Sequence, residues 1–333
     1  MIDFDGAAGE AVLRAGVAER LWPGAVAAVG TDGRTRAEWV LGHAEDHDRT
    51  QRPMRADTVF DLASLTKVLA TAPAVLLLAQ RGLLALDDRA AAYLPGLDER
   101  VRVRDLLTHT SGLPPHRDLS GAGSRLVATV AAMPLERAPG EAVAYSDLGF
   151  ILLGAVVEQV CGQRLDAFVR DELYAPVGSH ATFSPGPDTA ATEVVDGRAI
   201  TGRVHDENAA SATGAVGHAG LFGSLADVRV CLRIWQDAVL DDALRREALR
   251  DHTAATGGHR GLGWTCRGDG HDILSAGWGG AAVSHTGFTG TSVALDPRTG
   301  RWAILLTNAV HYGRNRPGVL PARRRWHAAV VGD

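Results

Sequence analysis

The sequence predicts an α+β fold, in which a central antiparallel sheet is flanked by N- and C-terminal helices and carries an inserted, mainly helical region. Two observations support this prediction. Clear strand patterns lie near the two ends of the chain, within residues 25–42 and 281–308, and helix-forming segments lie between them. Early and late strands that are far apart in the chain most simply join one sheet, with the intervening residues packed beside it.

The N-terminal part is expected to form a helix, a hairpin and a second helix. Residues 10–21 are amphipathic, and the strand-like runs Ala25–Gly30 and Ala37–Gly42 flank an Asp-Gly pair that is typical of a tight turn. The apolar run Ser64–Gln80 predicts a helix that ends at the following Arg-Gly pair. Ser64 would then lie in the first helical turn, where free N–H groups and the helix dipole favour negative charge.

The remaining elements follow from the same patterns. Helices are expected over residues 103–108, 148–160, 165–173, 225–239 and 320–331, loops over 179–220, and strands over 281–285, 291–296 and 302–308. The sequence therefore predicts a sheet region formed by residues 1–80 and 225–333 and a helical and loop region formed by residues 81–224. The cleft between these two regions is the expected place for a site.

Composition excludes several classes of function. The 333 residues are 46% hydrophobic and carry a formal net charge of -5, so a nucleic-acid partner is not expected. The densest basic run, Arg323-Arg324-Arg325, is interpreted as a solvated helix face or helix end. Three widely spaced cysteines and the lack of a metal-binding histidine pattern predict neither a metal site nor a disulfide framework. The N-terminal residues do not resemble a signal peptide and no apolar run is long enough to span a membrane, so we expect a cytoplasmic protein without a membrane partner, whose oligomeric state stays open.

Lys67 is the only lysine among the 34 lysine and arginine residues of the chain. Lysine can lose its proton inside a protein, whereas arginine effectively cannot. Ser64 precedes Lys67 by three residues, which places both side chains on one face of a helix. This is the geometry of a serine that is activated by an amine, although an isolated S-x-x-K match is weak by itself.

Two further motifs strengthen the prediction by their order. Tyr145-Ser146-Asp147 precedes an apolar helix, and His285-Thr286-Gly287, at the end of an expected edge strand, precedes Phe288. Taken singly, each could be ordinary packing or a common strand ending. With Ser64-x-x-Lys67, the chain resembles the class C branch of the serine β-lactamase and penicillin-binding-protein superfamily, which carries S-x-x-K, Y-x-N and K/H-T-G in this order. The similarity extends over residues 23–308 and includes the stretches 106–114 and 217–222.

This resemblance implies an acyl-enzyme mechanism without a cofactor. Ser64 would attack a carbonyl carbon, and Lys67 and Tyr145 would form the base system that moves its proton. The backbone N–H groups of Ser64 and Phe288 would form the oxyanion hole. His285, Thr286 and Gly287 would line the cleft and orient the substrate.

Two residues depart from the usual motifs. Asp147 replaces the asparagine, and a carboxylate beside Lys67 would favour the charged amine and leave Tyr145 as the proton acceptor, unless Asp147 turns away. His285 replaces the lysine of β-lactam-processing members, and a neutral imidazole is a poorer anchor for a substrate carboxylate. Histidine at this position resembles the esterase-like members.

The sequence thus predicts a serine hydrolase or acyltransferase that acts on a small ester or amide, an esterase or transacylase of secondary metabolism. If the acyl group is transferred, an amine or alcohol would accept it, and Phe288 and Trp278 would form an apolar wall that limits water. The alternatives are a true β-lactamase or D-amino-acid peptidase, and a non-catalytic binding module that uses the same cleft.

Overall fold

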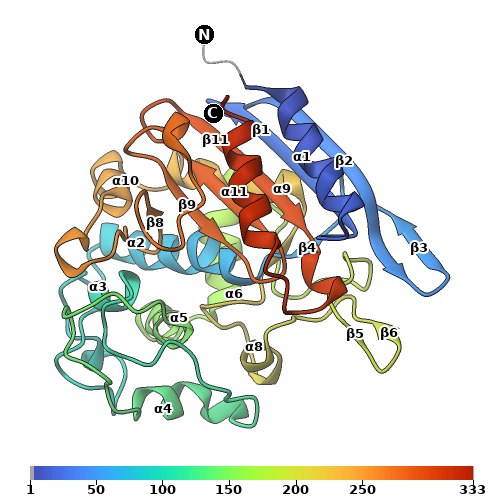
Figure 1. The fold of residues 1–333 in the computed structure, drawn as a ribbon. Coiled ribbons are helices and arrows are strands. Elements are labelled where there is room, and N and C mark those ends of the chain that lie inside the picture. Colours follow the sequence, from blue (N-terminus) through green and yellow to red (C-terminus); the bar gives the residue numbers. More distant parts are fainter. Residues whose placement is uncertain (1–3, 333) are drawn as a thin grey trace.

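The computed structural model describes residues 4–332 and confirms the predicted fold, an antiparallel sheet with helices on both faces (Figure 1). The strands of the main sheet lie in the order β3-β2-β1-β11-β10-β9-β8. Their bounds are β1 (Gly24–Thr31), β2 (Arg34–His47), β3 (Thr50–Pro53), β8 (Thr265–Cys266), β9 (Val283–Thr286), β10 (Ser292–Leu295) and β11 (Arg301–Thr307). The first hairpin of the chain therefore pairs with its last strands, as the sequence predicts.

β1 is an inner strand of the sheet and pairs with both β2 and β11. Its side chains alternate between two cores: Ala27 and Val29 face one side, and Val26 and Ala28 face the other. Successive side chains of a strand point to opposite faces. Because both faces of this strand are covered, its sequence is apolar without interruption.

Helices cover each face of the sheet. α1 (Gly6–Ala18) and α11 (Val319–Ala329) pack against each other on one face, visible in front of the sheet in Figure 1. α2 (Ala72–Gln80), α5 (Asp147–Cys161) and α9 (Leu225–Leu232) contribute to the core on the other face. The site lies where the helical layer of α5 meets the end of β9.

The remaining elements are short. They are α3 (Val103–Leu107), α4 (Leu126–Ala131), α6 (Leu165–Phe168), α7 (Ala175–Val177), α8 (Glu207–Ser211) and α10 (Asp242–Leu249), with the two-stranded sheets β4 (Phe60–Asp61) with β7 (Phe222–Gly223) and β5 (Val194–Val195) with β6 (Arg198–Ala199). The β4–β7 pair matters most for function, because β4 leads directly into the segment that carries Ser64.

The expected helix at residues 64–80 is divided in the structure. A 3₁₀ turn over Ala63–Leu65 is followed by a π-helical stretch over Lys67–Thr71, and only then by α2. Such stretches of π-helix are rare and often occur at functional sites. The serine and the lysine thus lie on irregular helical turns that periodicity alone does not predict.

Several boundaries differ from expectation, and some elements were not expected. α1 begins at Gly6, where Asp5 caps it, and ends at Ala18, because the chain reverses so that Trp22 packs on Gly16. The strand β3, the helix α10 and the strand β8 were not expected. β8 lies outside β9, so β9 is not the edge strand, although β8 pairs only with Val283 and Ser284 of β9. The division into a sheet region and a helical region stays a prediction.

One helical stretch is long and apolar enough to cross a membrane, judged by length and composition alone. It is Ala63–Gln80, and 83% of its 18-residue window is buried inside the protein. The bent pair Asp147–Cys161 and Leu165–Val177 meets the same criteria only if both helices are counted as one span. A core helix of a globular protein shows the same features, and the burial of Ala63–Gln80 is what the packing of the sheet requires.

Candidate active site

Ser64 and Lys67 meet as their spacing predicts. The Lys67 Nζ atom lies 2.9 Å from Ser64 Oγ, and the lysine side chain is 0% exposed. Ser64 follows Ala63, which has a positive φ of 48° and whose N–H donates to the buried carboxylate of Asp61. The turn therefore holds the serine at the cleft while the lysine lies enclosed behind it.

Three oxygen atoms surround the lysine amine. Besides Ser64 Oγ, Nζ lies 2.8 Å from Asp147 Oδ1 and 2.9 Å from the carbonyl oxygen of His218. An ammonium group has three N–H donors and no lone pair, so this arrangement uses all of its donors. The surroundings of Lys67 thus fit a charged amine and offer no position for a neutral one to accept a proton from Ser64.

Electrostatics favour the same charge state. Burial opposes the charged form of Lys67, but the Asp147 carboxylate and Tyr145 outweigh burial and raise its pKa above the ordinary value. Burial likewise opposes ionisation of Asp147, but Lys67 and His116 hold the pKa of that carboxyl well below its usual range. Asp147 faces the lysine and does not turn away.

Tyr145 lies close to the lysine amine. Its ring centroid is 5.1 Å from Lys67 Nζ and 5.7 Å from the guanidinium carbon of Arg260. Arg260 is buried and paired with Asp269 at 2.7 Å. The Tyr145 ring thus lies between the amine of Lys67 and the guanidinium of Arg260.

His109 holds the tyrosine loop in place. Its ring lies 4.5 Å from the Tyr145 ring, and its Nδ1 accepts a hydrogen bond from the N–H of Ser146 at 3.0 Å. Burial and the nearby charges of Arg260 and Lys67 hold the pKa of His109 well below its ordinary value, so the imidazole is neutral and suited to accept this bond. We did not identify His109 from the sequence as a site residue, although it lies within the family-like stretch 106–114.

The two residues expected to supply the oxyanion hole, Ser64 and Phe288, both line the cleft. The N–H groups of Ser64 and Phe288 donate to no other residue within the described range 4–332. The Thr291 hydroxyl, across the turn that begins at Gly287, donates to the carbonyl of Leu62 at 3.1 Å. A side chain at Gly287 would lie 2.6 Å from the same Leu62 carbonyl, so this close approach requires glycine. The two donor segments are therefore tied to each other.

His285 is neutral and has one unused ring nitrogen. Burial and the charges of Lys67 and Arg260 hold its pKa well below the ordinary value. Nδ1 lies 3.0 Å from the carbonyl of Thr286, and a carbonyl only accepts, so Nδ1 carries the proton. Nε2 is then an acceptor without a partner among the described residues. His285 thus offers the substrate a hydrogen-bond acceptor and no positive charge.

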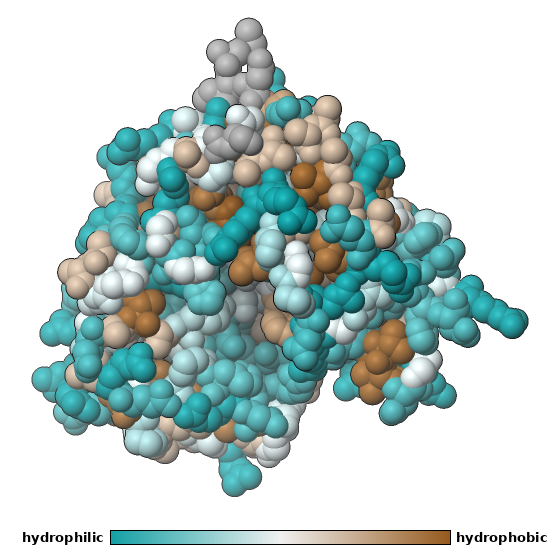
Figure 2. All heavy atoms as spheres, in the orientation of Figure 1, coloured by the Kyte–Doolittle hydropathy of each residue, from teal (hydrophilic) through white to brown (hydrophobic). Residues whose placement is uncertain are grey.

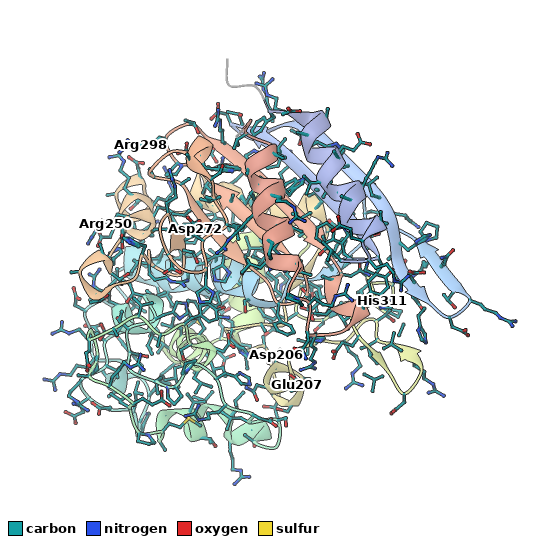
Figure 3. The ribbon with its side chains drawn as sticks, viewed as in Figure 1. Asp206, Glu207, Arg250, Asp272, Arg298 and His311 are labelled. Atoms are coloured by element: carbon teal, nitrogen blue, oxygen red, sulfur yellow. The ribbon has the colours of Figure 1, made fainter. Side chains whose placement is uncertain are left out.

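One cleft of about 520 Å³ is lined by Ser64, Tyr145, Arg260, His285 and Phe288, and it also contains Thr286, Gly287 and Asp147. Figure 2 shows a largely hydrophilic face that is hollowed near its centre. Asp206 and Glu207 lie at the start of α8 on the lower side of this region (Figure 3), and the Asp206 carboxylate accepts from the ring of His218 at 2.8 Å. Within residues 4–332, no group of three or more His, Cys, Asp or Glu side chains is arranged to hold a metal ion.

The expected apolar wall is only half present. Phe288 is 58% exposed and lines the cleft. The prediction for Trp278 was wrong: its side chain is 0% exposed, packs in the core beneath α11 and donates to the carbonyl of His327. A short turn after residue 275 directs this side chain to the other face of the sheet.

Arg323 corrects another prediction. Arg324 and Arg325 are exposed, as expected for a solvated face, but Arg323 is 6% exposed and lines the cleft. Successive residues of a helix point about 100° apart, so one residue of such a triplet can face inward. Its guanidinium is therefore a second cation of the site, beside Arg260, that the sequence did not reveal.

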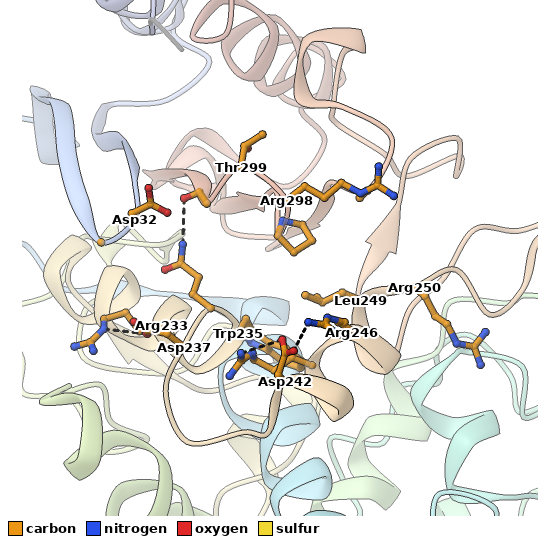
Figure 4. Close-up of a pocket in the computed structure, with 16 residues that line it drawn as sticks. Asp32, Arg233, Trp235, Asp237, Asp242, Arg246, Leu249, Arg250, Arg298 and Thr299 are labelled. Carbon is orange, nitrogen blue, oxygen red and sulfur yellow. Dashed lines mark hydrogen bonds and ion pairs between the residues drawn. The ribbon is translucent and has the colours of Figure 1, made fainter. Parts of the chain in front are cut away.

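A second hollow shows that size alone does not identify the site. It measures about 780 Å³ and lies between the β1–β2 turn, α10 and the turn before β11 (Figure 4). Its arginines are mostly paired with neighbouring acids, for example Arg233 with Asp237 at 3.5 Å. None of the predicted site residues lines it.

Comparisons with known proteins agree with this geometry. The sequence model of the family described as Beta-lactamase matches residues 10–325. The chain is 32% identical over 334 residues to a protein of Escherichia coli K12 named as a D-alanyl-D-alanine carboxypeptidase, covering 83% of this chain and 75% of that protein. It is 32% identical over 346 residues to a Bacillus subtilis protein named N-acetylmuramyl-L-alanine amidase, covering 87% of this chain and 78% of that protein. The solved structure of EstCE1, described as a hydrolase with promiscuous acyltransferase activity, superposes with a TM-score of 0.74 at 22% identity and covers 98% of both chains.

Proposed function

The chain belongs to the Beta-lactamase family and is a hydrolytic serine enzyme, and from this premise we propose that Ser64 forms an acyl-enzyme with a small ester or amide. The acyl group would then pass to water or to an amine or alcohol. The observation that carries the proposal is the enclosed contact between Lys67 Nζ and Ser64 Oγ at 2.9 Å, at the edge of a cleft that also contains two free backbone donors.

The chemistry follows from the charge state of the lysine. Ser64 Oγ forms a bond to the carbonyl carbon while its proton passes to Tyr145, which takes part in this step as the phenolate and becomes a phenol, because Lys67 has no free lone pair. The carbonyl π electrons move to the oxygen, which the N–H groups of Ser64 and Phe288 stabilise. When the tetrahedral intermediate collapses, the bond to the leaving group breaks and the leaving group receives the proton from Tyr145. Lys67 acts as a fixed positive charge that favours the anionic states of its neighbours.

The central test is intact mass spectrometry after incubation with activated esters, thioesters and β-lactams. We expect a covalent adduct on the wild-type chain and none on Ser64→Ala, which should also lose turnover. An unchanged adduct on the variant would place the nucleophile elsewhere. A wild-type chain that binds these compounds without any adduct would support the binding-module alternative.

Transfer to an acceptor is the finer part of the proposal. It is supported by the exposed ring of Phe288 at the cleft and by the fold shared with a hydrolase of acyltransferase activity. A well-positioned acceptor can have an effective molarity of ~10⁵ M or more, which exceeds that of water at about 55 M. Product partitioning with an activated ester and a panel of amines and alcohols tests this. Saturation by one acceptor supports transfer, and hydrolysis at every acceptor concentration refutes it. A role in secondary metabolism and a cytoplasmic location stay predictions.

A second candidate is a D-amino-acid peptidase. It is favoured by the buried, unpaired cation of Arg323 beside the cleft, which could attract a carboxylate, and by the names of the two curated relatives. A peptide that ends in D-Ala-D-Ala distinguishes the candidates. Release of D-alanine at a higher kcat/KM than the best ester would favour the peptidase, and its absence would favour the esterase or transacylase.

A further inference from the structure

The guanidinium of Arg323 is buried and has no acidic partner among the described residues. It projects from α11 into the core beside the cleft and is 6% exposed. Burial lowers its pKa to about 10, which leaves it charged at neutral pH. No carboxylate within residues 4–332 pairs with it, and its Nε has no partner there. An unpaired buried charge is costly, so its retention calls for a functional reason.

The guanidinium makes one strong contact. Nη2 donates to the carbonyl oxygen of Gly287 at 2.7 Å, a distance typical of a charge-assisted hydrogen bond. The carbonyl of Gly287 and the N–H of Phe288 belong to the same peptide group. That N–H is the second donor of the expected oxyanion hole, and it has no other partner among the described residues.

We propose that Arg323 is a positioning residue of the oxyanion hole, which orients the Gly287–Phe288 peptide and polarises it so that the Phe288 N–H stabilises the transition state more strongly. This inference rests on the proposed acyl-enzyme chemistry of Ser64. Peptide resonance couples the carbonyl oxygen to the amide nitrogen. A cation at the oxygen therefore withdraws electrons from the N–H at the other end, and hydrogen bonds that share one group strengthen each other.

Hydrogen bonds around the Gly287–Phe288 peptide fix its orientation relative to Arg323. Gly287 N–H donates to the carbonyl of Thr291 at 2.7 Å, and the Thr289 hydroxyl donates to the carbonyl of Asp61 at 2.7 Å. The turn is thus held at both ends, and Arg323 approaches the carbonyl from the side of α11. His327, one helical turn further, is neutral because burial, with a smaller contribution from Arg323, lowers its pKa to about 3, so it adds no second positive charge beside Arg323.

Three substitutions separate charge from hydrogen bonding. Arg323→Lys keeps the charge, Arg323→Gln keeps a donor without charge, and Arg323→Met removes both. Loss of an entire oxyanion donor costs ~10²–10³ in kcat, so weakening one donor is expected to cost roughly 10-fold in Arg323→Gln, more in Arg323→Met and less in Arg323→Lys. Arg325→Gln, on the exposed side of the same helix, is the matched control and should be unchanged.

The probe is p-nitrophenyl acetate, a neutral ester without a carboxylate, and the readout is the rate of Ser64 acylation in single turnover. We expect acylation to slow while the apparent affinity for the ester stays constant. The apparent affinity for phenylboronic acid, which forms a tetrahedral anion on serine, should fall by a similar factor. The melting temperature should not fall in Arg323→Met, because an unpaired buried charge is replaced by an apolar side chain.

Each contrary outcome has a definite meaning. Wild-type acylation rates in both Arg323→Gln and Arg323→Met would overturn the inference. So would a loss that is confined to anionic substrates and to KM, because Arg323 would then act as a carboxylate anchor. A fall in melting temperature that matches the loss of activity in all three variants would reduce Arg323 to a structural residue. If the wild-type chain forms no adduct with any ester, the proposed function itself fails. This differs from the result in which an adduct forms at a rate that the Arg323 substitutions do not change, which overturns only the role of Arg323.

Discussion

Replacing Asp147 by asparagine is expected to convert Lys67 from a fixed charge into a titratable amine. Two unit charges 2.8 Å apart attract each other by about 6 kcal/mol at an effective dielectric constant of about 20. Asparagine still accepts a hydrogen bond, so the net loss should be closer to the 3–5 kcal/mol, roughly, that removal of one partner from a buried pair costs. Loss of the carboxylate removes the main cause that raises the pKa of Lys67, so the pKa of this amine should fall in the variant.

The direction of each pKa shift determines how the ion pair changes the free energy of unfolding with pH. The folded pKa of Lys67 is raised, so its contribution to the free energy of unfolding is present below its ordinary pKa and is lost as pH rises through the folded value. The folded pKa of Asp147 is lowered, so its contribution is present above its ordinary pKa and is lost as pH falls. The pair therefore stabilises the fold across the neutral range. Asp147→Asn should lower the free energy of unfolding at pH 7 by about 3 kcal/mol.

The assay uses the fact that Lys67 is the only lysine. Lysine labelled with ¹⁵N at Nζ gives one side-chain resonance, and its titration by NMR reports the pKa directly. The matched control is His116→Gln, which removes the other charged neighbour of Asp147, 3.7 Å away, and leaves the ion pair intact. If Lys67 in Asp147→Asn stays protonated to the same pH as in the wild type, the ion pair does not set its charge and the reasoning fails. The pH–rate profile should change with the NMR titration, because a neutral Lys67 could then act as the base.

Three other substitutions test the remaining roles. Lys67→Arg should lower kcat/KM by at least ~10², because a planar guanidinium does not fit the enclosed space between Ser64, Asp147 and the His218 carbonyl; a near-wild-type rate in steady-state kinetics would show that only charge is needed. Tyr145→Phe should slow acylation in stopped-flow measurements with substrate affinity unchanged, and a rise in KM alone would make the tyrosine a binding residue. Wild-type hydrolysis of penicillin should be slow because His285 is neutral, and His285→Lys should raise it modestly; efficient hydrolysis by the wild type would favour the β-lactamase alternative.

Sequence patterns predicted the parts of this molecule that depend on local order. The strand-like runs near the two ends of the chain predicted the antiparallel sheet, and the spacing of three residues predicted the contact between Ser64 and Lys67. That contact forms although the local backbone is 3₁₀ and then π-helical, because Ser64 lies in the 3₁₀ turn, a geometry that places the side chains of i and i+3 above one another. The approach of Asp147 to Lys67 across 80 residues came from motif order and not from periodicity.

The parts that were missed depend on tertiary burial. Arg260 and Arg323 belong to no motif, and a basic triplet gives no sign of which member turns inward until α11 is docked on the sheet. The packing of Trp278 likewise depends on a short turn whose direction its sequence does not specify. His109 acts through a backbone contact with Ser146, and such contacts leave no periodic pattern.

The backbone conformation of Ala63 constrains the orientation of the nucleophile, Ser64. An L-residue in the left-handed region costs roughly 1–2 kcal/mol, so the residue directly before Ser64 stores strain that the surrounding contacts hold in place. Glycine would adopt the same backbone angles without that cost, and a search for thermostable variants would be drawn to this position. The relaxed chain would leave the serine free to sample other orientations. Thermal stability would then rise while the orientation of Ser64 became less precise. A substitution selected for stability at this position would therefore lower activity.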